Sequence, residues 1–249
     1  MSDRGGSPPP ARREWAYFLD VDGTLLDLAP TPDAVRVRRE THDLVHALHA
    51  ATGGALALVS GRAIGDVDRL FPDGVLPIAG QHGLERRDAA GVTTRVPVHA
   101  EALAHARARL AELAARHEGL LLEDKGMSLA VHYRAAPQHE ALVHDVVRGT
   151  AAALGEAWLV QRGKRVVELR PASADKGAAI RAYLAESPFA GRVPVFIGDD
   201  ATDEHGFEEV NRLGGHSIKV GEGASVARWR LRDVREVALW LGEAVAAPR

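Results

Sequence analysis

The chain has 249 residues, of which 46% are hydrophobic and 26% charged, with a formal net charge of −3 and no cysteine. A chain of this size buries enough apolar surface to fold as one large domain, or as a core with a modest insertion, without disulfides or a structural metal. The balanced charge, the lack of cysteine and the absence of a long apolar run exclude a basic nucleic-acid binder, thiolate catalysis and a membrane span. We therefore expect a cytoplasmic protein with neither nucleic acid nor membrane as a partner.

The first third of the chain predicts a core of alternating strands and helices. Residues 1–14 are rich in Arg and Pro and predict a disordered tail. The hydrophobic pattern then predicts a buried strand over 15–20, a helix over 33–51, a strand over 55–59, a helix over 63–70 and a strand over 76–79. This alternation favours an α/β fold with a Rossmann-like, doubly wound parallel sheet.

The middle of the chain predicts an inserted domain of a different class. Its pattern indicates a helix over 101–117, strands over 120–123 and 128–133, a helix over 138–154, and strands over 158–161 and 165–170. Successive strands joined by glycine-containing turns are typical of an antiparallel α+β unit. We therefore expect residues 89–172 to form an inserted α+β domain.

The last third returns to the alternating pattern, so residues 15–88 and 173–249 are expected to form the core together. Helices are predicted over 175–186, 203–210 and 234–245, and strands over 193–197 and 217–220. The Arg-rich stretch around 228–232 is interpreted as a solvated helix face.

Polar motifs follow three of the predicted core strands: Asp20-x-Asp22-Gly-Thr, Ser60-Gly-Arg62 and Gly198-Asp199-Asp200. Ligands of open parallel sheets bind at the carboxyl ends of the strands, so these remote segments are expected to converge. Carboxylates held close together raise one another's pKa and destabilise a fold unless a cation compensates them. A few carboxylates completed by waters and substrate oxygens are typical of Mg²⁺, whereas lone loop aspartates more often cap turns.

The same cluster indicates phosphoryl transfer. An aspartate can attack phosphorus and form an aspartyl-phosphate, and this chemistry depends on positioning and on neutralising the phosphoryl oxygens. Ser60 offers a hydroxyl donor, and the backbone around Gly23 and Gly61 offers N–H groups. Lys176 opens a predicted helix after Asp175 and is expected to reach the same place; the alternative is a solvated surface lysine.

Lysine is scarce in this chain. It occurs only at Lys125, Lys164, Lys176 and Lys219, although Lys and Arg together number 31. Because an ammonium and a guanidinium are not equivalent at a compact, desolvated site, each remaining lysine is a candidate for a specific role. The pattern assigns no role to Lys164 or Lys219.

The motifs together resemble a known superfamily. Asp20-Val-Asp-Gly-Thr-Leu25, Ser60, Lys176 and Gly198-Asp-Asp-Ala-Thr-Asp203 follow the order of the four motifs of the haloacid dehalogenase superfamily. Over nearly its whole length the chain is more narrowly similar to the trehalose-6-phosphate phosphatases. The markers of this narrower resemblance are Leu58–Arg62, His82–Arg86, Val167–Pro171, Gly198–Glu204 and the block Glu123-Asp-Lys-Gly-Met-Ser-Leu-Ala-Val-His-Tyr-Arg134.

The resemblance implies a Mg²⁺-dependent hydrolysis of trehalose 6-phosphate to trehalose and phosphate. It implies that Asp20 is the nucleophile that attacks phosphorus. Asp22 resembles the general acid/base, which protonates the leaving sugar oxygen and then activates water. Ser60 and Lys176 resemble the groups that hold the phosphate.

The resemblance also implies a metal site. Its ligands would be the carboxylates of Asp20 and Asp199 and the backbone carbonyl of Asp22. Asp200 and Asp203 resemble carboxylates that support these ligands without binding the metal. The implied cofactor is Mg²⁺.

Glu123 and Lys125 flank one predicted turn of the inserted domain, and Glu168 lies on a facing strand. On the residues alone, these charges fit an exposed cross-strand ion pair of about 0.2–1 kcal/mol, or a site that holds sugar hydroxyls by charge-assisted hydrogen bonds. The resemblance implies the sugar site, in a cap over residues 89–172 that closes on the substrate. In the core, His82 and Gly83 end a predicted strand and are candidates for substrate contact.

Three alternative functions stay open. The same chemistry could act on sucrose phosphate or a glucosylglycerate-type phosphate, or a phosphomutase could pass the phosphoryl group to a sugar. A catalytically silent sugar-phosphate sensor or synthase scaffold is the third alternative, against which the presence of Asp20, Asp22, Lys176 and Asp199 argues. We expect a small sugar phosphate as the partner and a monomer or weak homo-oligomer.

Overall fold

The computed structural model describes residues 6–28 and 35–247, and the chain divides into two compact units. One unit takes in the chain up to Thr94 and from Asp175 onward, and the other runs from Arg95 to Ala174. The sequence-based boundaries, at 88/89 and 172/173, lie slightly earlier at both junctions. The first difference arises because two strands, β4 (Glu85–Arg87) and β5 (Thr93–Arg95), extend the sheet of the first unit.

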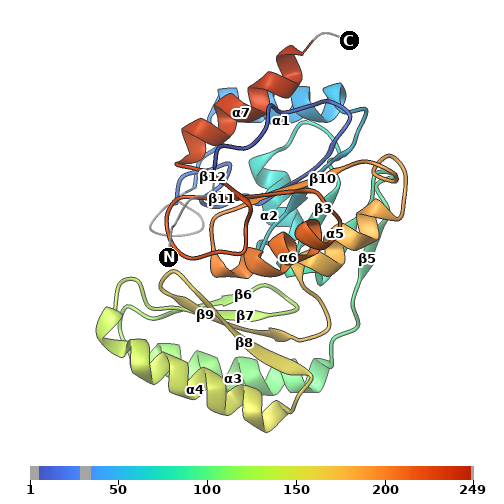
Figure 1. Cartoon of the computed structure of the whole chain (residues 1–249). Helices are drawn as coiled ribbons and strands as arrows, with labels where there is room; N and C mark the ends of the chain where they lie inside the picture. Colours follow the sequence, from blue (N-terminus) through green and yellow to red (C-terminus); the bar gives the residue numbers. More distant parts are fainter. Residues whose placement is uncertain (1–5, 29–34, 248–249) are drawn as a thin grey trace. The chain divides into compact units, whose positions relative to one another are not determined.

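Eight strands within the described ranges form the sheet of the first unit, in the order β12-β11-β10-β1-β2-β3-β4-β5 (Figure 1). Neighbours from β12 to β3 are parallel, and β4 is antiparallel to β3. The parallel strands are β1 (Ala16–Leu19), β2 (Leu56–Val59), β3 (Ile78–Gly80), β10 (Pro194–Gly198), β11 (His216–Val220) and β12 (Trp229–Leu231). The prediction of a doubly wound parallel core is confirmed.

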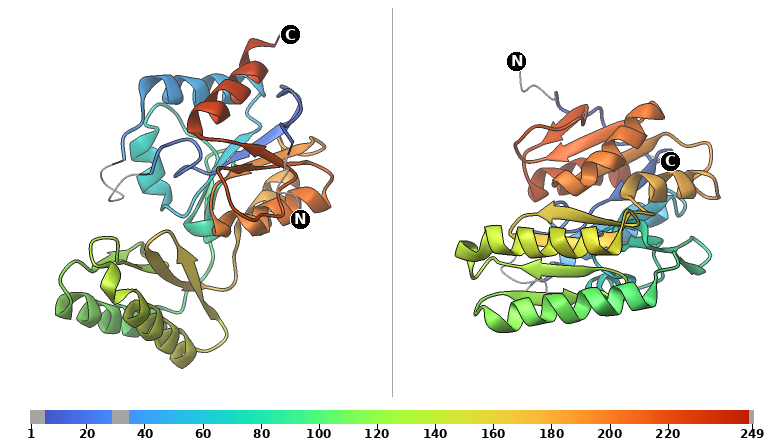
Figure 2. Two further views of the ribbon diagram at one scale, coloured as in Figure 1. Left: turned by 60° about the vertical axis from the view of Figure 1, so that its left-hand side comes forward. Right: turned by 90° about the horizontal axis from the view of Figure 1, so that it is seen from below.

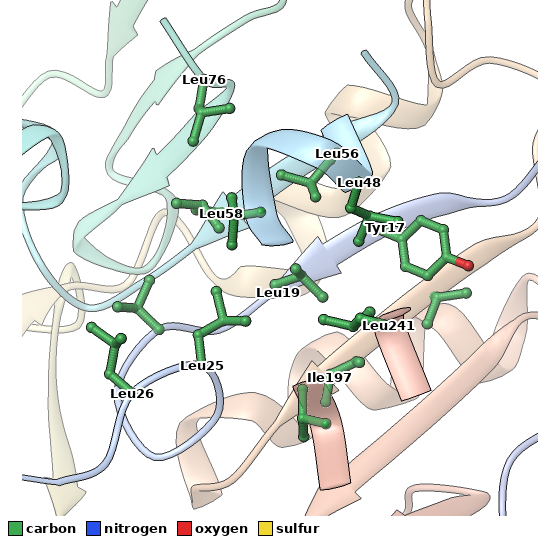
Figure 3. Close-up of a cluster of buried hydrophobic side chains, with 14 of the residues drawn as sticks. Tyr17, Leu19, Leu25, Leu26, Leu48, Leu56, Leu58, Leu76, Ile197 and Leu241 are labelled. Carbon is green, nitrogen blue, oxygen red and sulfur yellow. The ribbon is translucent and has the colours of Figure 1, made fainter. Parts of the chain in front are cut away.

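Helices cover both faces of this sheet, which explains why its central strands are apolar runs rather than alternating ones. On one face, Tyr17 and Leu19 of β1 pack in a cluster with α1 (Arg39–Ala51), α2 (Ile64–Leu70) and α7 (Val234–Ala246) (Figure 3). On the other face, Phe18 packs with α5 (Lys176–Leu184) and α6 (Glu204–Arg212). Each large apolar side chain buried in this way contributes roughly 1.5–3 kcal/mol.

The second unit is an antiparallel sheet covered by two helices. Its strands β6 (Leu121–Asp124), β7 (Leu129–His132), β9 (Val166–Pro171) and β8 (Trp158–Gly163) lie in that order. The long helices α3 (Ala100–Arg116) and α4 (Glu140–Leu154) run side by side along one face (Figures 1 and 2), and α4 follows the short 3₁₀ turn η3 (Pro137–His139). The predicted α+β pattern of the insertion is therefore observed.

Three local expectations differ from the structure, and two of the differences have a tertiary cause. Residues 1–5 of the expected disordered tail lie outside the described residues, but Gly6 pairs with Trp229 of β12, and residues 9–13 contact α7. Arg13 donates to the carbonyls of Ala244 and Val245 near the end of that helix, at 3.0 and 2.7 Å, and Trp240 Nε1 donates to the carbonyl of Pro9 at 2.9 Å. The two bonds from Arg13 satisfy carbonyls that a helix end leaves without intrahelical partners, so α7 orders this part of the tail.

The other two differences concern element bounds and type. The helix expected over 33–51 begins at Arg39, with residues 33 and 34 outside the described residues. The stretch read as a solvated helix face contains the parallel strand β12, and Arg230 donates to the carbonyls of Gly221 and Gly223. Pairing with β11 overrides the local polarity there. None of the described helices combines the length and apolarity that a membrane crossing requires.

Candidate active site

The loop that follows β1 carries the first pair of acidic residues. Asp20 comes directly after the strand, and its backbone N–H donates to the carbonyl of Ile197 in β10 at 3.0 Å. Gly23 then takes a φ of 82°, and a Cβ at that position would lie 2.2 Å from Oδ2 of Asp199. Glycine therefore lets this loop pass directly against the acidic segment that follows β10.

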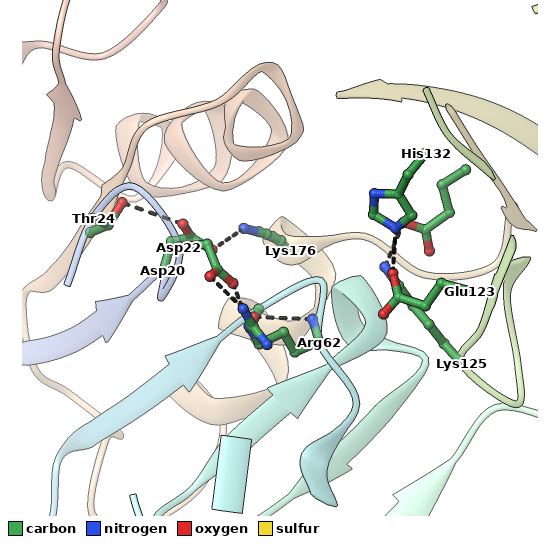
Figure 4. Close-up of polar contacts among 10 residues, drawn as sticks. Asp20, Asp22, Thr24, Arg62, Glu123, Lys125, His132 and Lys176 are labelled. Carbon is green, nitrogen blue, oxygen red and sulfur yellow. Dashed lines mark hydrogen bonds and ion pairs between the residues drawn. The ribbon is translucent and has the colours of Figure 1, made fainter. Parts of the chain in front are cut away.

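Lys176 connects the two acidic segments. It begins α5, which is capped by the Asp175 side chain accepting the N–H of Ala178 at 2.7 Å. Its Nζ donates to Oδ1 of Asp20 at 2.7 Å (Figure 4) and to Oδ1 of Asp203 at 2.6 Å, although the residue is only 2% exposed. Burial by itself lowers the pKa of Lys176, but the two carboxylates outweigh it and raise the pKa, so the group stays an ammonium.

The loop after β10 is shaped by Asp203, which ends the short 3₁₀ turn η4 (Ala201–Asp203). Its Oδ2 accepts the backbone N–H groups of Asp199 and Asp200, both at 2.9 Å. The Asp200 side chain accepts the N–H of Ala201 and so caps the same turn. A Cβ at Gly198 would lie 2.3 Å from Cγ of Asp203, so glycine is needed where the strand meets this turn.

The charges of this cluster fit a divalent metal. Asp20, Asp199 and Asp203 each bring a carboxylate oxygen within 4.8 Å of the others. Burial raises the pKa of Asp20 well above its ordinary value and Asp203 and Asp199 raise it further, against the opposing charge of Lys176. A hard divalent cation relieves such an excess of negative charge on oxygen donors. Asp203 accepts from Lys176 through one oxygen and from two backbone N–H groups through the other, whereas, among the described residues, the second oxygen of Asp20 accepts only from the Thr24 hydroxyl, at 3.3 Å. Asp20 and Asp199 are therefore the better ligand candidates.

Asp22 is held by an arginine to which sequence reasoning gave no role. Nε and one terminal nitrogen of Arg62 donate to the two carboxylate oxygens of Asp22 at 2.6 and 2.8 Å (Figure 4). The backbone N–H of Arg62 donates to Oγ of Ser60 at 3.1 Å. The segment after β2 is thereby connected to the loop after β1, as the sequence predicted for strand ends of one parallel sheet.

The predicted substrate-contact residues of the core are also brought together. Ser60 is 1% exposed, and its carbonyl accepts the backbone N–H of His82 at 2.9 Å. His82 lies in the 3₁₀ turn η2 (Gln81–Gly83) with a φ of 58°, and a Cβ at Gly61 would lie 2.7 Å from its ring. Gly83 packs on the start of α5, where a Cβ would lie 3.0 Å from the carbonyl of Asp175. Glycine at 61 and 83 is thus required by close packing.

Lys219 contacts the backbone of the acidic cluster. It is on β11, is 6% exposed, and its Nζ donates to the backbone carbonyl of Asp199. A buried ammonium is costly without a partner, so this contact ties its charge to the loop that carries the candidate ligand. Two features of the sequence pointed to Lys219: lysine is scarce in this chain, and Lys219 lies between two apolar residues of a predicted core strand.

The second unit holds a polar cluster of its own. Lys125 Nζ donates to Oε2 of Glu168 at 3.0 Å, and Oγ of Ser128 donates to Oε1 of the same carboxylate at 2.6 Å. Glu123 Oε2 lies 2.7 Å from Nε2 of His132 (Figure 4). Burial raises the pKa of Glu123, but the hydrogen bond from His132 and the charge of Lys125 outweigh it, so the pKa lies below its ordinary value. Glu123 is therefore a carboxylate at neutral pH.

The predicted site residues thus fall into two groups. Those of the first unit are brought together at the carboxyl ends of its strands: Asp20, Asp22, Gly23, Ser60, Gly61, His82, Gly83, Lys176, Asp199, Asp200 and Asp203. Glu123, Lys125 and Glu168 lie together in the second unit. Sequence reasoning missed the contacts of Ser128 and His132, although both lie within the motif block that ends at Arg134.

The fold and the strand-end cluster define the class: this is a haloacid dehalogenase-like α/β protein. A solved structure, the C-terminal domain of Candida albicans trehalose-6-phosphate phosphatase, has the same fold, with a TM-score of 0.83 over 92% of this chain and 91% of that one at 18% identity.

More similar sequences identify the family. The trehalose-phosphatase family model matches residues 18–234. The trehalose-6-phosphate phosphatase of Escherichia coli strain K12 is 44% identical over 94% of this chain and 87% of its own length. The probable trehalose-phosphate phosphatase of Sinorhizobium fredii is 47% identical over 83% of this chain and 78% of its own length. The chain belongs to the trehalose-phosphatase family.

Proposed function

We propose that the chain is a phosphoric monoester hydrolase that converts trehalose 6-phosphate to trehalose and phosphate, the last step of trehalose biosynthesis. The observation that carries the proposal is the buried carboxylate of Asp20, held by Lys176 and close to Asp199 at the strand ends. An enzyme needs such a fixed, desolvated carboxylate to attack phosphorus. The substrate is proposed from the family and from the name of the Escherichia coli relative.

The reaction is proposed to proceed in two steps. In the first, an Asp20 oxygen bonds to phosphorus, the bond from phosphorus to the sugar oxygen breaks, and Asp22 donates a proton to that oxygen. In the second, Asp22 takes a proton from water, the water oxygen bonds to phosphorus, and the bond to Asp20 breaks. Lys176 and Ser60 hold the phosphoryl oxygens, assisted by backbone N–H groups around positions 23 and 61.

The contact between Arg62 and Asp22 bears on the first step. Both oxygens of the Asp22 carboxylate are occupied by the guanidinium. Asp22 must therefore leave at least one of these bonds before it can take up a proton and deliver it to the sugar oxygen. We propose that substrate phosphate, which also attracts a guanidinium, draws Arg62 away from Asp22.

We propose Mg²⁺ as the cation, bound by the carboxylates of Asp20 and Asp199 and by the backbone carbonyl of Asp22. When bound, Mg²⁺ supplies positive charge that stabilises the transferring phosphoryl group. Asp203 orients Asp199 through the two backbone N–H groups that it accepts, and Asp200 caps the turn that contains Asp203.

We propose that the second unit, Arg95–Ala174, is the substrate-specificity cap that the sequence predicted over residues 89–172. Glu123, Lys125 and Glu168 would hold hydroxyl groups of the disaccharide by charge-assisted hydrogen bonds. His82 and Gly83 are proposed as further substrate contacts in the core. A cytoplasmic location and a monomeric or weakly associating state stay predictions from the sequence.

The test is phosphate release from a panel of sugar phosphates, with Mg²⁺ and after chelation. We expect a sharp preference for trehalose 6-phosphate over sucrose phosphate and glucose 6-phosphate, and loss of activity on chelation. Equal turnover of several sugar phosphates would contradict the proposed substrate. Phosphosugar isomers formed without free phosphate would instead identify a phosphomutase.

A further inference from the structure

The four-stranded sheet of the second unit has an apolar face and a polar face. Leu129, Val131 and Val167 belong to the apolar cluster that packs with α3 and α4. Successive side chains of a strand point to opposite faces, so Ala130 and His132 lie on the other face of β7. The polar face is therefore formed by residues that alternate with the apolar core.

The strand register builds a row of side chains across this polar face. Ala130 pairs with Glu123 of β6 on one side and with Glu168 of β9 on the other. His132 lies two residues beyond Ala130 on the same face. The smallest side chain thus separates two carboxylates, with a histidine beside them.

The two carboxylates have different amounts of hydrogen-bonding capacity left. Both oxygens of Glu168 accept bonds, from Lys125 and Ser128. Glu123 accepts from His132 through Oε2, and over residues 6–28 and 35–247 its Oε1 has no hydrogen-bond partner. Since a carboxylate only accepts hydrogen bonds, Nε2 of His132 must be the donor. The bond turns one oxygen of Glu123 toward His132 and leaves the other oxygen for a ligand hydroxyl.

We propose that His132 is a positioning residue that fixes Glu123 and thereby sets the selectivity for phosphate esters that carry a second sugar ring. The inference rests on the proposed function, because it assigns a role within the same sugar site. A free glutamate loses rotamer entropy when it binds a hydroxyl, and a glutamate already held by His132 loses less. His132 therefore acts on binding of the sugar and not on the phosphoryl chemistry.

The test compares two substitutions of His132. His132→Phe keeps a ring of similar size and a residue favourable to strands, but removes the donor. His132→Gln replaces Nε2 by an amide nitrogen that can donate to the same oxygen. For trehalose 6-phosphate we expect KM to rise about tenfold in His132→Phe with kcat nearly unchanged, and to stay close to wild type in His132→Gln. p-Nitrophenyl phosphate, which has no sugar hydroxyl, should show no change in either variant.

Two controls separate positioning from folding. His105→Phe alters an exposed histidine on α3 of the same unit and should change neither substrate's KM. In a double-mutant cycle, Glu123→Gln should raise KM much less in the His132→Phe background than in the wild type, because the two residues act as one unit. Circular dichroism and the melting temperature report whether each variant is folded.

Each outcome decides between the two proposals. An unchanged KM for trehalose 6-phosphate in His132→Phe, additive effects in the cycle, or an equal rise in KM for p-nitrophenyl phosphate overturns the role of His132. A wild-type protein that prefers another sugar phosphate overturns the proposed substrate. The same variants are then compared on that sugar phosphate, where unchanged selectivity again overturns the role of His132. A wild-type protein inactive on every ester overturns both.

Discussion

The strand-end cluster of the first unit and the polar face of the second unit use the same groups, carboxylates beside cations, in different surroundings. Lys176, Asp20 and Asp203 are between 0 and 5% exposed. The side chains of Glu123 and His132 are 25 and 23% exposed. Charges interact more strongly where water is excluded, so the first arrangement is rigid and the second retains capacity for a ligand.

The difference in exposure separates chemistry from recognition. A buried ion pair that loses one partner leaves an uncompensated charge and costs about 3–5 kcal/mol, whereas an exposed pair contributes about 0.2–1 kcal/mol. Changes in the strand-end cluster should therefore affect turnover and stability together. Changes of Glu123 and His132 should affect selectivity and leave the fold intact, whereas the pair Lys125–Glu168 on the same face is nearly as buried as the strand-end cluster. The predictions below test that division, from the largest expected effect to the smallest.

Asp20→Asn is expected to have the largest effect on turnover. The amide keeps the shape of the side chain but is not a nucleophile, so kcat should fall at least about a thousandfold. Steady-state phosphate release measures the loss, and the melting temperature checks the fold. Asp27→Asn, at a side chain 81% exposed in the same part of the chain, is the matched control. Unchanged phosphate release from Asp20→Asn would show that the nucleophile assignment is wrong.

Lys176→Met is expected to reduce both turnover and stability. It removes the ammonium that pairs with Asp20 and Asp203, so two buried carboxylates lose their compensating charge. The free energy of unfolding should fall by about 3–5 kcal/mol, as measured by urea denaturation. Lys176→Arg should not restore activity, since a guanidinium does not fit a site built for a compact ammonium. A stable and active Lys176→Met protein would show that the strand-end cluster is no more sensitive to substitution than the polar face of the second unit.

Lys219→Met tests how far the strand-end cluster extends. Methionine fills a similar volume on β11 but cannot donate to the carbonyl of Asp199. The lost bond should cost about 1–3 kcal/mol of unfolding free energy and lower the affinity for Mg²⁺, because Asp199 is less firmly held. Calorimetry of Mg²⁺ binding measures the second effect. Mg²⁺ affinity equal to that of the wild type would confine Lys219 to a purely structural role.

Glu123→Gln tests the other side of the comparison. The neutral amide keeps the size of the side chain but weakens the charge-assisted bond to a sugar hydroxyl. We expect about a tenfold lower kcat/KM for trehalose 6-phosphate, with the turnover of p-nitrophenyl phosphate and the melting temperature unchanged. Glu101→Gln, on the exposed start of α3, serves as the control. A parallel loss for both substrates would place Glu123 in the chemistry rather than in recognition.

The positions of Asp20, Ser60 and Asp199 were predictable because the topology of a parallel sheet brings strand ends together regardless of sequence distance. Gly23 was expected at the same place for its backbone N–H, and the positive φ that requires glycine there is seen only in the structure. The alternation of strands and helices likewise predicted the sheet and its insertion. These features depend on local pattern and on one general rule of topology.

The features that were missed depend on partners far along the chain. β12 is a three-residue strand with a charged centre, and only its pairing with β11 makes it a strand. Residues 9–13 are held by α7, more than two hundred residues away: Arg13 donates to carbonyls at the end of that helix, and the indole of Trp240 donates to the carbonyl of Pro9. The pairing of Arg62 with Asp22, and of His132 with Glu123, requires side-chain directions that a motif does not contain. Tertiary contacts decide all of these.

Glu209 of α6 combines a buried carboxylate with exposed cations, so it is intermediate between the strand-end cluster and the polar face. Its substitution has the smallest expected effect on stability. Glu209 is 6% exposed, but its partners Arg181 of α5 and Arg212 have side chains 61% exposed. Hydrogen bonds from Arg212 and Arg181 lower the pKa of Glu209 to about 2. A carboxyl group whose pKa is depressed on folding stabilises the protein above its ordinary pKa, and that stability is lost as pH falls toward 2.

Glu209→Gln should therefore reduce the free energy of unfolding at neutral pH by about 1 kcal/mol, because the exposed arginines are screened by water. It should also flatten the decline of unfolding free energy between about pH 4.5 and pH 2. Urea denaturation across this range measures both, with the exposed neighbour Glu208→Gln as control. A cost near that of Lys176→Met would mean that burial of the carboxylate alone decides the energy of a pair. A cost near 1 kcal/mol would mean that the exposure of the arginines weakens the pair as much as burial of the carboxylate strengthens it. The contrast between the strand-end cluster and the polar face requires this second result.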